Sequence, residues 1–142
     1  EGPQLTWLKA DLEAHPNACS LAIFHHPRFT SGLTEGGALY NFWDILYQHN
    51  TEIVINGHDH DYERFAPQNP LGQADPLGIR EFVVGTGGAS QYGLGTRKAN
   101  SEVFHSGSFG VLKLTLGEGI YQWEFLPVTG EPFTDSGSGI CH

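Results

Sequence analysis

The sequence contains no methionine and few basic residues. Seven Lys and Arg stand against sixteen Asp and Glu in 142 residues, which gives a formal net charge of −9. Because nucleic-acid binding requires a basic surface, a chain this acidic is not expected to bind nucleic acid. A substrate that carries phosphate would need local positive charge in the protein, and a bound metal ion could supply that charge.

Long hydrophobic runs are also absent. No stretch approaches the roughly 18 to 20 consecutive apolar residues of a membrane-spanning helix, so we expect no membrane partner. The chain begins at Glu1 without an initiating methionine, and we expect a processed product or a part of a longer protein, in which a targeting segment could precede it. Its length suits a single unit, residues 1–142, with a core of its own.

Cysteine occurs twice, at Cys19 and Cys141. Cys141 follows a stretch of Ser and Gly that would be mobile unless something held it. A disulfide with Cys19 would hold it and would imply an oxidising compartment, extracellular or periplasmic. The alternative is two unrelated thiols. The G-x-S-x-G signature of a serine nucleophile is missing.

Helical spacing of apolar residues predicts two helices. Leu5, Leu8 and Leu12 lie on one face of the first, over residues 3–14, and a proline suits its first turn. Residues 38–48 repeat the spacing and predict the second helix.

Continuous and alternating apolar runs predict the strands. We expect buried strands at 18–24, 52–55 and 80–88, the last ending in a glycine-rich turn, and a hairpin at 110–116 and 120–126. The remaining long segments, 57–79 and 89–108, are expected to be loops. Because helices alternate with the buried strands, the sequence predicts the α/β class.

Two of the buried strands end in histidine. The first leads into His25 and His26, and the second leads through an Asn-Gly pair into His58 and His60. The helix between these strands would act as a crossover that makes them parallel, so both histidine pairs should emerge at the same edge of the sheet. Ligands bind at that edge in open α/β sheets.

Imidazole groups at neighbouring strand ends predict a metal site. His58 and His60 can point the same way from extended backbone, while Asp59 between them is not expected to be a ligand. Together with His25 they suit Zn²⁺, Fe or Mn²⁺. The alternative is a polar surface loop. Because His26 follows His25 directly, we expect its side chain to point away from the site.

Polar groups near these histidines are candidates for substrate binding. Arg28 could clamp a phosphate group bidentately, and a surface arginine paired with an acid is the alternative. The glycine-rich turn that carries Thr86 and Gly87 could approach a substrate or an anion, although it lacks the lysine of a P-loop. The alternative, which the sequence favours, is a close-packed turn beside the metal site.

Two motifs, AIFHHP at residues 22–27 and GHDHDYER at 57–64, resemble those of calcineurin-like metallophosphoesterases, closest to the purple acid phosphatase branch. That family carries a V-x-x-H block, here with Ala in place of Val, and a G-H-x-H block often followed by Y-E-R. The resemblance implies a four-layer α/β/β/α fold with two metal ions, Fe, Zn or Mn. His25 and His58 would bind one metal and His60 the other. It also implies hydrolysis of a phosphate ester by a metal-bound hydroxide.

The Y-E-R triplet is assigned a supporting part. Tyr62, Glu63 and Arg64 are expected to brace the ligand loop by packing and ion pairing, and not to react.

The sequence also departs from the family pattern. The blocks G-D-x, G-D-x-x-Y and G-N-H-[DE], which supply the bridging carboxylate and further ligands, do not occur in it. We therefore expect the C-terminal portion of the domain, with the N-terminal half as a missing partner. Thr34 and Glu35 stand where many purple enzymes have histidines that face the leaving group, which leaves His26 as the candidate catalytic acid.

Three hypotheses follow. The first is a metal-dependent phosphoesterase whose two-metal site is completed by residues outside this chain. The second is a binding module with one metal on three histidines, or an inactive scaffold. The third is a structural domain without metal.

Overall fold

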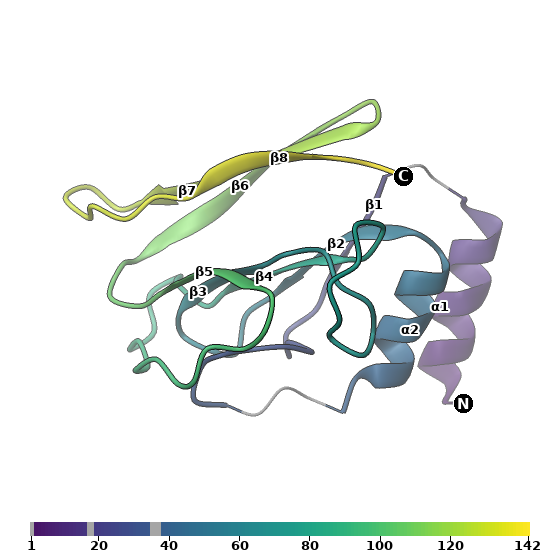
Figure 1. Ribbon diagram of the computed structural model, residues 1–142, viewed down its shortest axis with the longest axis horizontal. Coiled ribbons are helices and arrows are strands. Elements are labelled where there is room, and N and C mark those ends of the chain that lie inside the picture. The colour runs from purple at the N-terminus through teal and green to yellow at the C-terminus, as the bar shows by residue number, and fades with distance from the viewer. Residues whose placement is uncertain (1, 17–18, 35–37) are drawn as a thin grey trace.

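The computed structural model describes residues 2–16, 19–34 and 38–142. Its elements in chain order are α1 (Pro3–Ala14), β1 (Ser20–Ile23), α2 (Tyr40–Gln48), β2 (Thr51–Asn56), β3 (Tyr62–Phe65), β4 (Arg80–Val84), β5 (Ser101–His105), β6 (Gly110–Gly117), β7 (Ile120–Pro127) and β8 (Ser136–Ile140). Strands β6 to β8 form a sheet of their own that lies over the sheet of β1 to β5, and the two helices lie side by side (Figure 1).

The larger sheet has the strand order β1-β2-β4-β3-β5. Strands β1, β2 and β4 are parallel, whereas β3 is antiparallel to both β4 and β5. Helix α2 is the crossover from β1 to β2, so the carboxyl ends of these two strands lie at one edge of the sheet. The predicted α/β class is confirmed, because the described residues form a helix layer and two sheets.

Neighbouring residues of β2 divide the core in two. Val54 faces the helices and packs in a cluster with Trp43 and Leu46 of α2. Ile53 points to the opposite face and packs with aromatic residues of the smaller sheet, among them Trp123 and Phe125. The larger sheet is therefore covered on both faces, as the continuous apolar run of β2 predicts.

Strand β1 is shorter and more exposed than predicted. The sequence favours a strand over residues 18–24 that is covered on both faces, but β1 spans Ser20–Ile23, and the side chain of Ile23 is 73% exposed. Residue 18 lies outside the described residues. The physical reason is that β1 is an edge strand, paired to β2 alone.

Three strands are absent from the sequence prediction. Strands β3 and β5 lie in segments expected to be loops, and their polar residues obscure the pattern. Strand β8 consists largely of Ser and Gly, which have little strand preference. A side chain at Gly137 or Gly139 would collide with the rings of Trp123 and Tyr121, so the small residues of β8 allow it to pack closely on β7.

The predicted disulfide is confirmed. Cys19 and Cys141 are bonded, with their Cα atoms 5.4 Å apart. Cys19 comes directly before β1 and Cys141 directly after β8, so the bond joins an end of each sheet.

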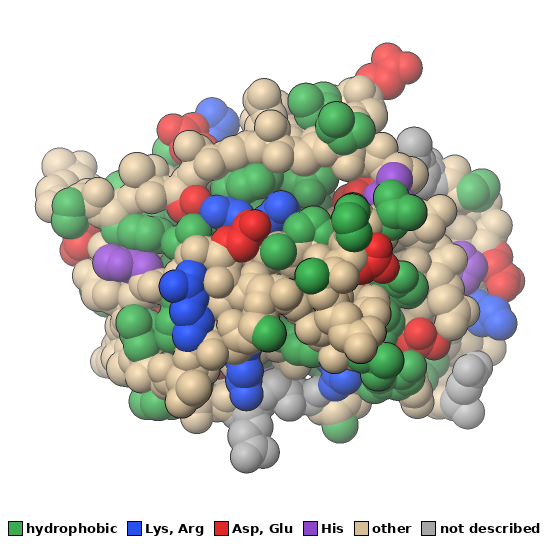
Figure 2. Space-filling model, viewed as in Figure 1, with side chains coloured by type: hydrophobic (Ala, Val, Ile, Leu, Met, Phe, Trp, Pro, Cys, Tyr) green, Lys and Arg blue, Asp and Glu red, His purple; other side chains and the backbone are tan. Residues whose placement is uncertain are grey.

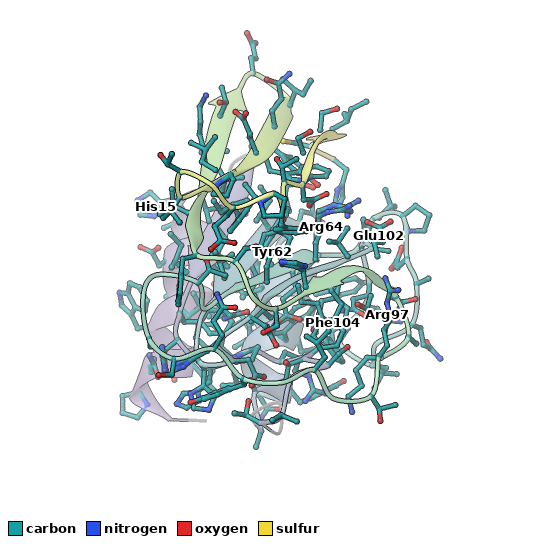
Figure 3. All side chains as sticks on the ribbon, turned by 90° about the vertical axis from the view of Figure 1, so that its left-hand side faces the viewer. His15, Tyr62, Arg64, Arg97, Glu102 and Phe104 are labelled. Carbon is teal, nitrogen blue, oxygen red and sulfur yellow. A yellow bond between two sulfur atoms is a disulfide. The ribbon has the colours of Figure 1, made fainter. Side chains whose placement is uncertain are left out.

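A polar network lies where the two sheets meet. Asp135 accepts hydrogen bonds from the Tyr62 hydroxyl at 2.7 Å, from Arg64 Nε at 2.7 Å and from Trp123 Nε1 at 3.1 Å. Arg64 and Arg80 flank Trp123, each with its guanidinium carbon 5.0 Å from the indole centre. Figure 3 shows Tyr62 and Arg64 beside this boundary, and Figure 2 shows acidic and basic side chains gathered along it.

The hydrogen bonds of this network stabilise the charged form of Asp135. Burial alone would raise the pKa of Asp135, but the hydrogen bonds from Arg64 and Tyr62 outweigh burial and lower that pKa below its ordinary value. A carboxyl group with a lowered pKa stabilises the fold above its ordinary pKa, and this contribution is lost as the pH falls through the lowered value.

Replacement of this acid should weaken the contact between the sheets. In Asp135→Ala, three part-buried side chains lose their acceptor, and we expect the free energy of unfolding to fall by on the order of 3 kcal/mol. Urea denaturation measures this. Glu124→Ala removes an exposed pair with Lys113 and is expected to change stability by less than about 1 kcal/mol. Equal losses in the two variants would contradict this view of Asp135.

Candidate metal centre

Three histidines from the two strand ends lie together. Ring nitrogens of His25, His26 and His58 are within 4.8 Å of one another, and His25 Nε2 is 3.2 Å from His58 Nδ1. The His26 ring is also close to that of His58, with 4.2 Å between their centres. The parallel strands therefore bring both histidine segments to one edge, as predicted.

The prediction that His26 points away is wrong. Strand β1 ends at Ile23, and the backbone bends at His25 and His26 before Pro27. The alternation of side chains that holds in a strand does not extend into a bend. Both rings can consequently lie on the side of His58.

The side chain and backbone of residues 56–57 hold these segments together. Asn56 Nδ2 donates to the carbonyl oxygens of Phe24 at 2.8 Å and His26 at 3.3 Å. The Gly57 N–H donates to the His25 carbonyl at 3.0 Å. Three consecutive carbonyls are therefore fixed by two residues at the end of β2. The sequence signal for this contact is a polar Asn at the end of an apolar strand.

His58 occupies an unusual backbone position. Its φ is 65°, in the left-handed region that non-glycine residues rarely adopt and that is common at functional sites. Burial lowers the pKa of His58, and the neighbouring His26 and His25 lower it further. The neutral ring is thereby favoured, which is the form that binds a metal ion.

His60 lies outside this cluster of three. The left-handed turn at His58 interrupts the extended backbone on which the expected common orientation of His58 and His60 depends. The His60 ring stacks on Tyr92 with 4.2 Å between centres, and its Nδ1 is 2.7 Å from the Ser90 carbonyl. Because a carbonyl only accepts, Nδ1 carries the proton and Nε2 is left as the ligand atom. Nothing in the sequence points to Tyr92 as the partner of His60.

Buried acids hold the loop that follows the first histidine pair. Asp59 is fully buried and accepts hydrogen bonds from the hydroxyl groups of Thr30 and Thr34, so it is occupied as a structural acceptor. Glu63 accepts from Ser31 N at 2.7 Å. Glu81 accepts from the backbone N–H groups that begin the loop, Arg28 at 2.9 Å and Phe29 at 3.2 Å.

The Y-E-R triplet divides between two tasks. Glu63 contacts the loop through Ser31, whereas Tyr62 and Arg64 turn to Asp135 and the smaller sheet. This division follows from strand alternation in β3, which sends successive side chains to opposite faces. Tyr62 and Arg64 therefore do not brace the ligand loop directly.

Asp61 is the one buried acid of this segment that lacks partners among the described residues. It is fully buried, and neither of its carboxylate oxygens accepts a hydrogen bond there. Burial, followed by the nearby charges of Asp59 and Glu63, raises its pKa to about 7.

The three residues predicted to contact a substrate differ in their exposure and in their contacts. Thr86 is buried and its hydroxyl donates to the Gly110 carbonyl at 2.9 Å, so its side chain faces inward, as in a close-packed turn, and its contact with a substrate stays a prediction. Gly87 is exposed beside open space. The Arg28 side chain donates to the Pro70 carbonyl at 3.1 Å and lies over the Phe29 and Tyr40 rings. None of these contacts involves the histidines. Glu35 lies outside the described residues.

The donor set fits a metal ion that prefers imidazole. Ligand nitrogens in a tetrahedral zinc site lie about 3.4 Å apart, since each Zn–N bond is about 2.0–2.1 Å. The 3.2 Å between His25 and His58 is close to that spacing. A two-metal centre also requires a bridging ligand, which these histidines cannot provide.

Comparison with known proteins identifies the class of this fold. No protein-family model matches the chain. A purple acid phosphatase from yellow lupin (Lupinus luteus) seeds superposes with a TM-score of 0.81 at 19% identity, over 96% of this chain and 28% of that one. GAP50, the anchor in the inner membrane complex of Plasmodium, superposes with a TM-score of 0.75 at 21% identity, over 92% of this chain and 40% of that one. The fold is that of the metallophosphoesterases.

Sequence relatives are more specific. Purple acid phosphatase 18 of Arabidopsis thaliana is 32% identical over 118 residues, which are 75% of this chain and 26% of the relative. Purple acid phosphatase 22 of the same plant is 28% identical over 129 residues, 84% of this chain and 30% of the relative. The chain is thus homologous to the purple acid phosphatases and spans about a quarter of their length. The resemblance drawn from its two histidine motifs is confirmed.

Among the described residues, no helix is both long enough and apolar enough to cross a membrane.

The buried acid Glu81 should make stability depend on pH. Burial raises its pKa well above the ordinary value, although Arg28 and Phe29 donate to it. Its contribution to stability is therefore complete below its ordinary pKa and is lost as the pH rises through the raised value. In Glu81→Gln we expect this decline at pH values above the ordinary pKa of a glutamate to flatten, as measured by thermal unfolding. The exposed control Glu118→Gln should keep the parent profile; an unchanged profile in Glu81→Gln would refute this role.

Proposed function

We propose that this chain is the C-terminal portion of a metal-dependent phosphoesterase that hydrolyses phosphate esters at a two-metal centre. The observation that carries the proposal is the meeting of His25 and His58 at one sheet edge, 3.2 Å apart, in a chain homologous to purple acid phosphatases. His25 and His58 would hold one ion and His60 the other, with Fe, Zn or Mn as candidate metals. Carboxylate ligands would come from the N-terminal half of the domain, outside this chain.

The residues of this chain would hold the metal ions and orient the histidine rings that bind them. The pKa of His58 is lowered by burial, so the ring is available as a neutral ligand. The Ser90 carbonyl and the Tyr92 ring fix the orientation of His60, which leaves Nε2 free. When bound, the ions would supply Lewis-acid stabilisation of negative charge and activation of water.

The charge of the chain supports a metal-based mechanism. With a net charge of −9, the protein repels phosphate esters at long range. The histidine edge offers imidazole ligands, and divalent or trivalent ions held there would reverse the local charge. Of the sequence candidates for direct substrate contact, Gly87 and Arg28 keep exposed or part-exposed positions.

The disulfide supports a location outside the reducing cytosol. Cys19 and Cys141 are paired, and such bonds persist in oxidising compartments. We therefore propose that the protein acts in an extracellular or periplasmic setting.

A non-catalytic metal-binding module is the second candidate function. It is favoured by the three-histidine cluster, which belongs entirely to this chain. A fold shared with enzymes does not by itself confer their activity. Elemental analysis separates the two candidates when this chain is joined to the missing N-terminal half of the domain, because the completed phosphoesterase should hold two ions and the module one.

The proposed function is tested by hydrolysis of an aryl phosphate. Supplied with Fe, Zn or Mn, the 142 residues alone should show little hydrolysis, because the bridging ligand is absent. A chimera that joins the preceding half of a homologous purple acid phosphatase to Glu1 should hydrolyse the ester and hold two ions.

The matched control for that chimera is His58→Ala with His60→Ala, which should lower the hydrolysis rate by at least about 100-fold. Robust hydrolysis by the isolated chain with a two-metal centre would contradict the view that ligands are missing. A folded, two-metal chimera without activity would contradict the proposed function.

A further inference from the structure

We propose that His25, His26 and His58 form a three-imidazole site that binds one divalent transition-metal ion within this chain, with His26 as the third ligand. The sequence suggests His26 as a catalytic acid, and the geometry points to a ligand instead. The proposal shares His25 and His58 with the proposed function, but it depends on neither phosphate hydrolysis nor the missing half of the domain.

The spacing of the three rings carries the inference. Their nitrogens lie within 4.8 Å of one another, and the His25–His58 pair is already 3.2 Å apart. Tetrahedral coordination needs about 3.4 Å between ligand nitrogens. The rings of His25 and His26 are exposed, so their side chains have room to rotate toward that spacing.

The backbone beneath the rings is fixed in advance. Asn56 donates to the carbonyls on either side of His25, those of Phe24 and His26, and the Gly57 N–H donates to the His25 carbonyl. These bonds attach the first histidine segment to the two residues directly before His58. A ligand set held by its backbone loses less entropy when it binds an ion.

His60 is a poorer third ligand for the same ion. Its stacking on Tyr92 and the bond from its Nδ1 to the Ser90 carbonyl hold the ring outside the cluster, so its free Nε2 is available to a different ion. Within the described residues, His25, His26 and His58 are the group of three possible metal ligands whose ligand atoms all lie within 4.8 Å of one another. His26 thus takes the position that residue spacing alone assigns to His60.

The donor chemistry selects the class of ion. Three neutral imidazoles suit Zn²⁺, Co²⁺, Ni²⁺ and Cu²⁺, whereas Mg²⁺ and Ca²⁺ prefer oxygen ligands. Three protein ligands leave a tetrahedral ion with one open position, which a water molecule can fill.

The test titrates the full 142-residue chain with Co²⁺ while visible absorption is recorded, and with Zn²⁺ by calorimetry. The parent should bind one equivalent of Co²⁺ and one equivalent of Zn²⁺ in the separate titrations. Bound Co²⁺ should show the intense visible absorption bands of a four-coordinate ion, and Ca²⁺ should not compete with either metal. His26→Ala should weaken binding by at least about tenfold, because even indirect partners of a metal ligand contribute about 10- to 100-fold. The control His49→Ala, at the end of α2, should bind as the parent does.

Two further measurements keep the outcome decisive. His60→Ala should retain the first equivalent, whereas a His25–His58–His60 site would lose it. Metal-free thermal unfolding of His26→Ala and His26→Gln verifies that both variants fold. Parent-like affinity in folded His26→Ala, loss of the first equivalent in His60→Ala, or no binding by the parent would each overturn the proposal. Because no readout involves hydrolysis, its failure is distinct from failure of the phosphoesterase function.

Discussion

The attachment of β1 to β2 at their carboxyl ends is the constraint on which the site depends. Asn56 and Gly57 at the end of β2 bind three consecutive carbonyls, those of Phe24, His25 and His26. The parallel register beneath them brings both strands to the same edge, and the crossover helix α2 makes that register possible. Without this attachment the two histidine segments would be separate polar loops on the surface. With it, they form one ligand set.

Buried carboxylates extend this arrangement outward. Asp59, Glu63 and Glu81 are all fully or nearly fully buried, and they accept hydrogen bonds from the loop between β1 and α2. Burying so many acids is unfavourable unless each is satisfied, and Asp61 is not satisfied by the described residues. The buried acids around the G-H-x-H motif therefore fix the position of the neighbouring loop at a cost in folding stability. The Asp135 network and the disulfide hold the two sheets together elsewhere.

The sequence predicts those features that local pattern controls, and it fails where distant contacts decide. The helices, the parallel strands and the meeting of His25 with His58 follow from apolar spacing and crossover topology. Strand β8 does not, because its glycines matter only through the rings of Trp123 and Tyr121. The orientation of His26 depends on a bend after β1, and the stacking of His60 depends on a loop thirty residues away. The inward hydroxyl of Thr86 likewise depends on Gly110 in the smaller sheet.

Anomalous X-ray diffraction from crystals of the Zn²⁺-loaded chain tests the central claim, that the joined strand ends are a metal site. The expected result is a zinc peak between the β1 and β2 ends, with ring nitrogens of His25 and His58 at about 2.0–2.1 Å from the ion. A peak bound to other side chains, or no ordered zinc at this edge while the strands remain joined, would contradict it.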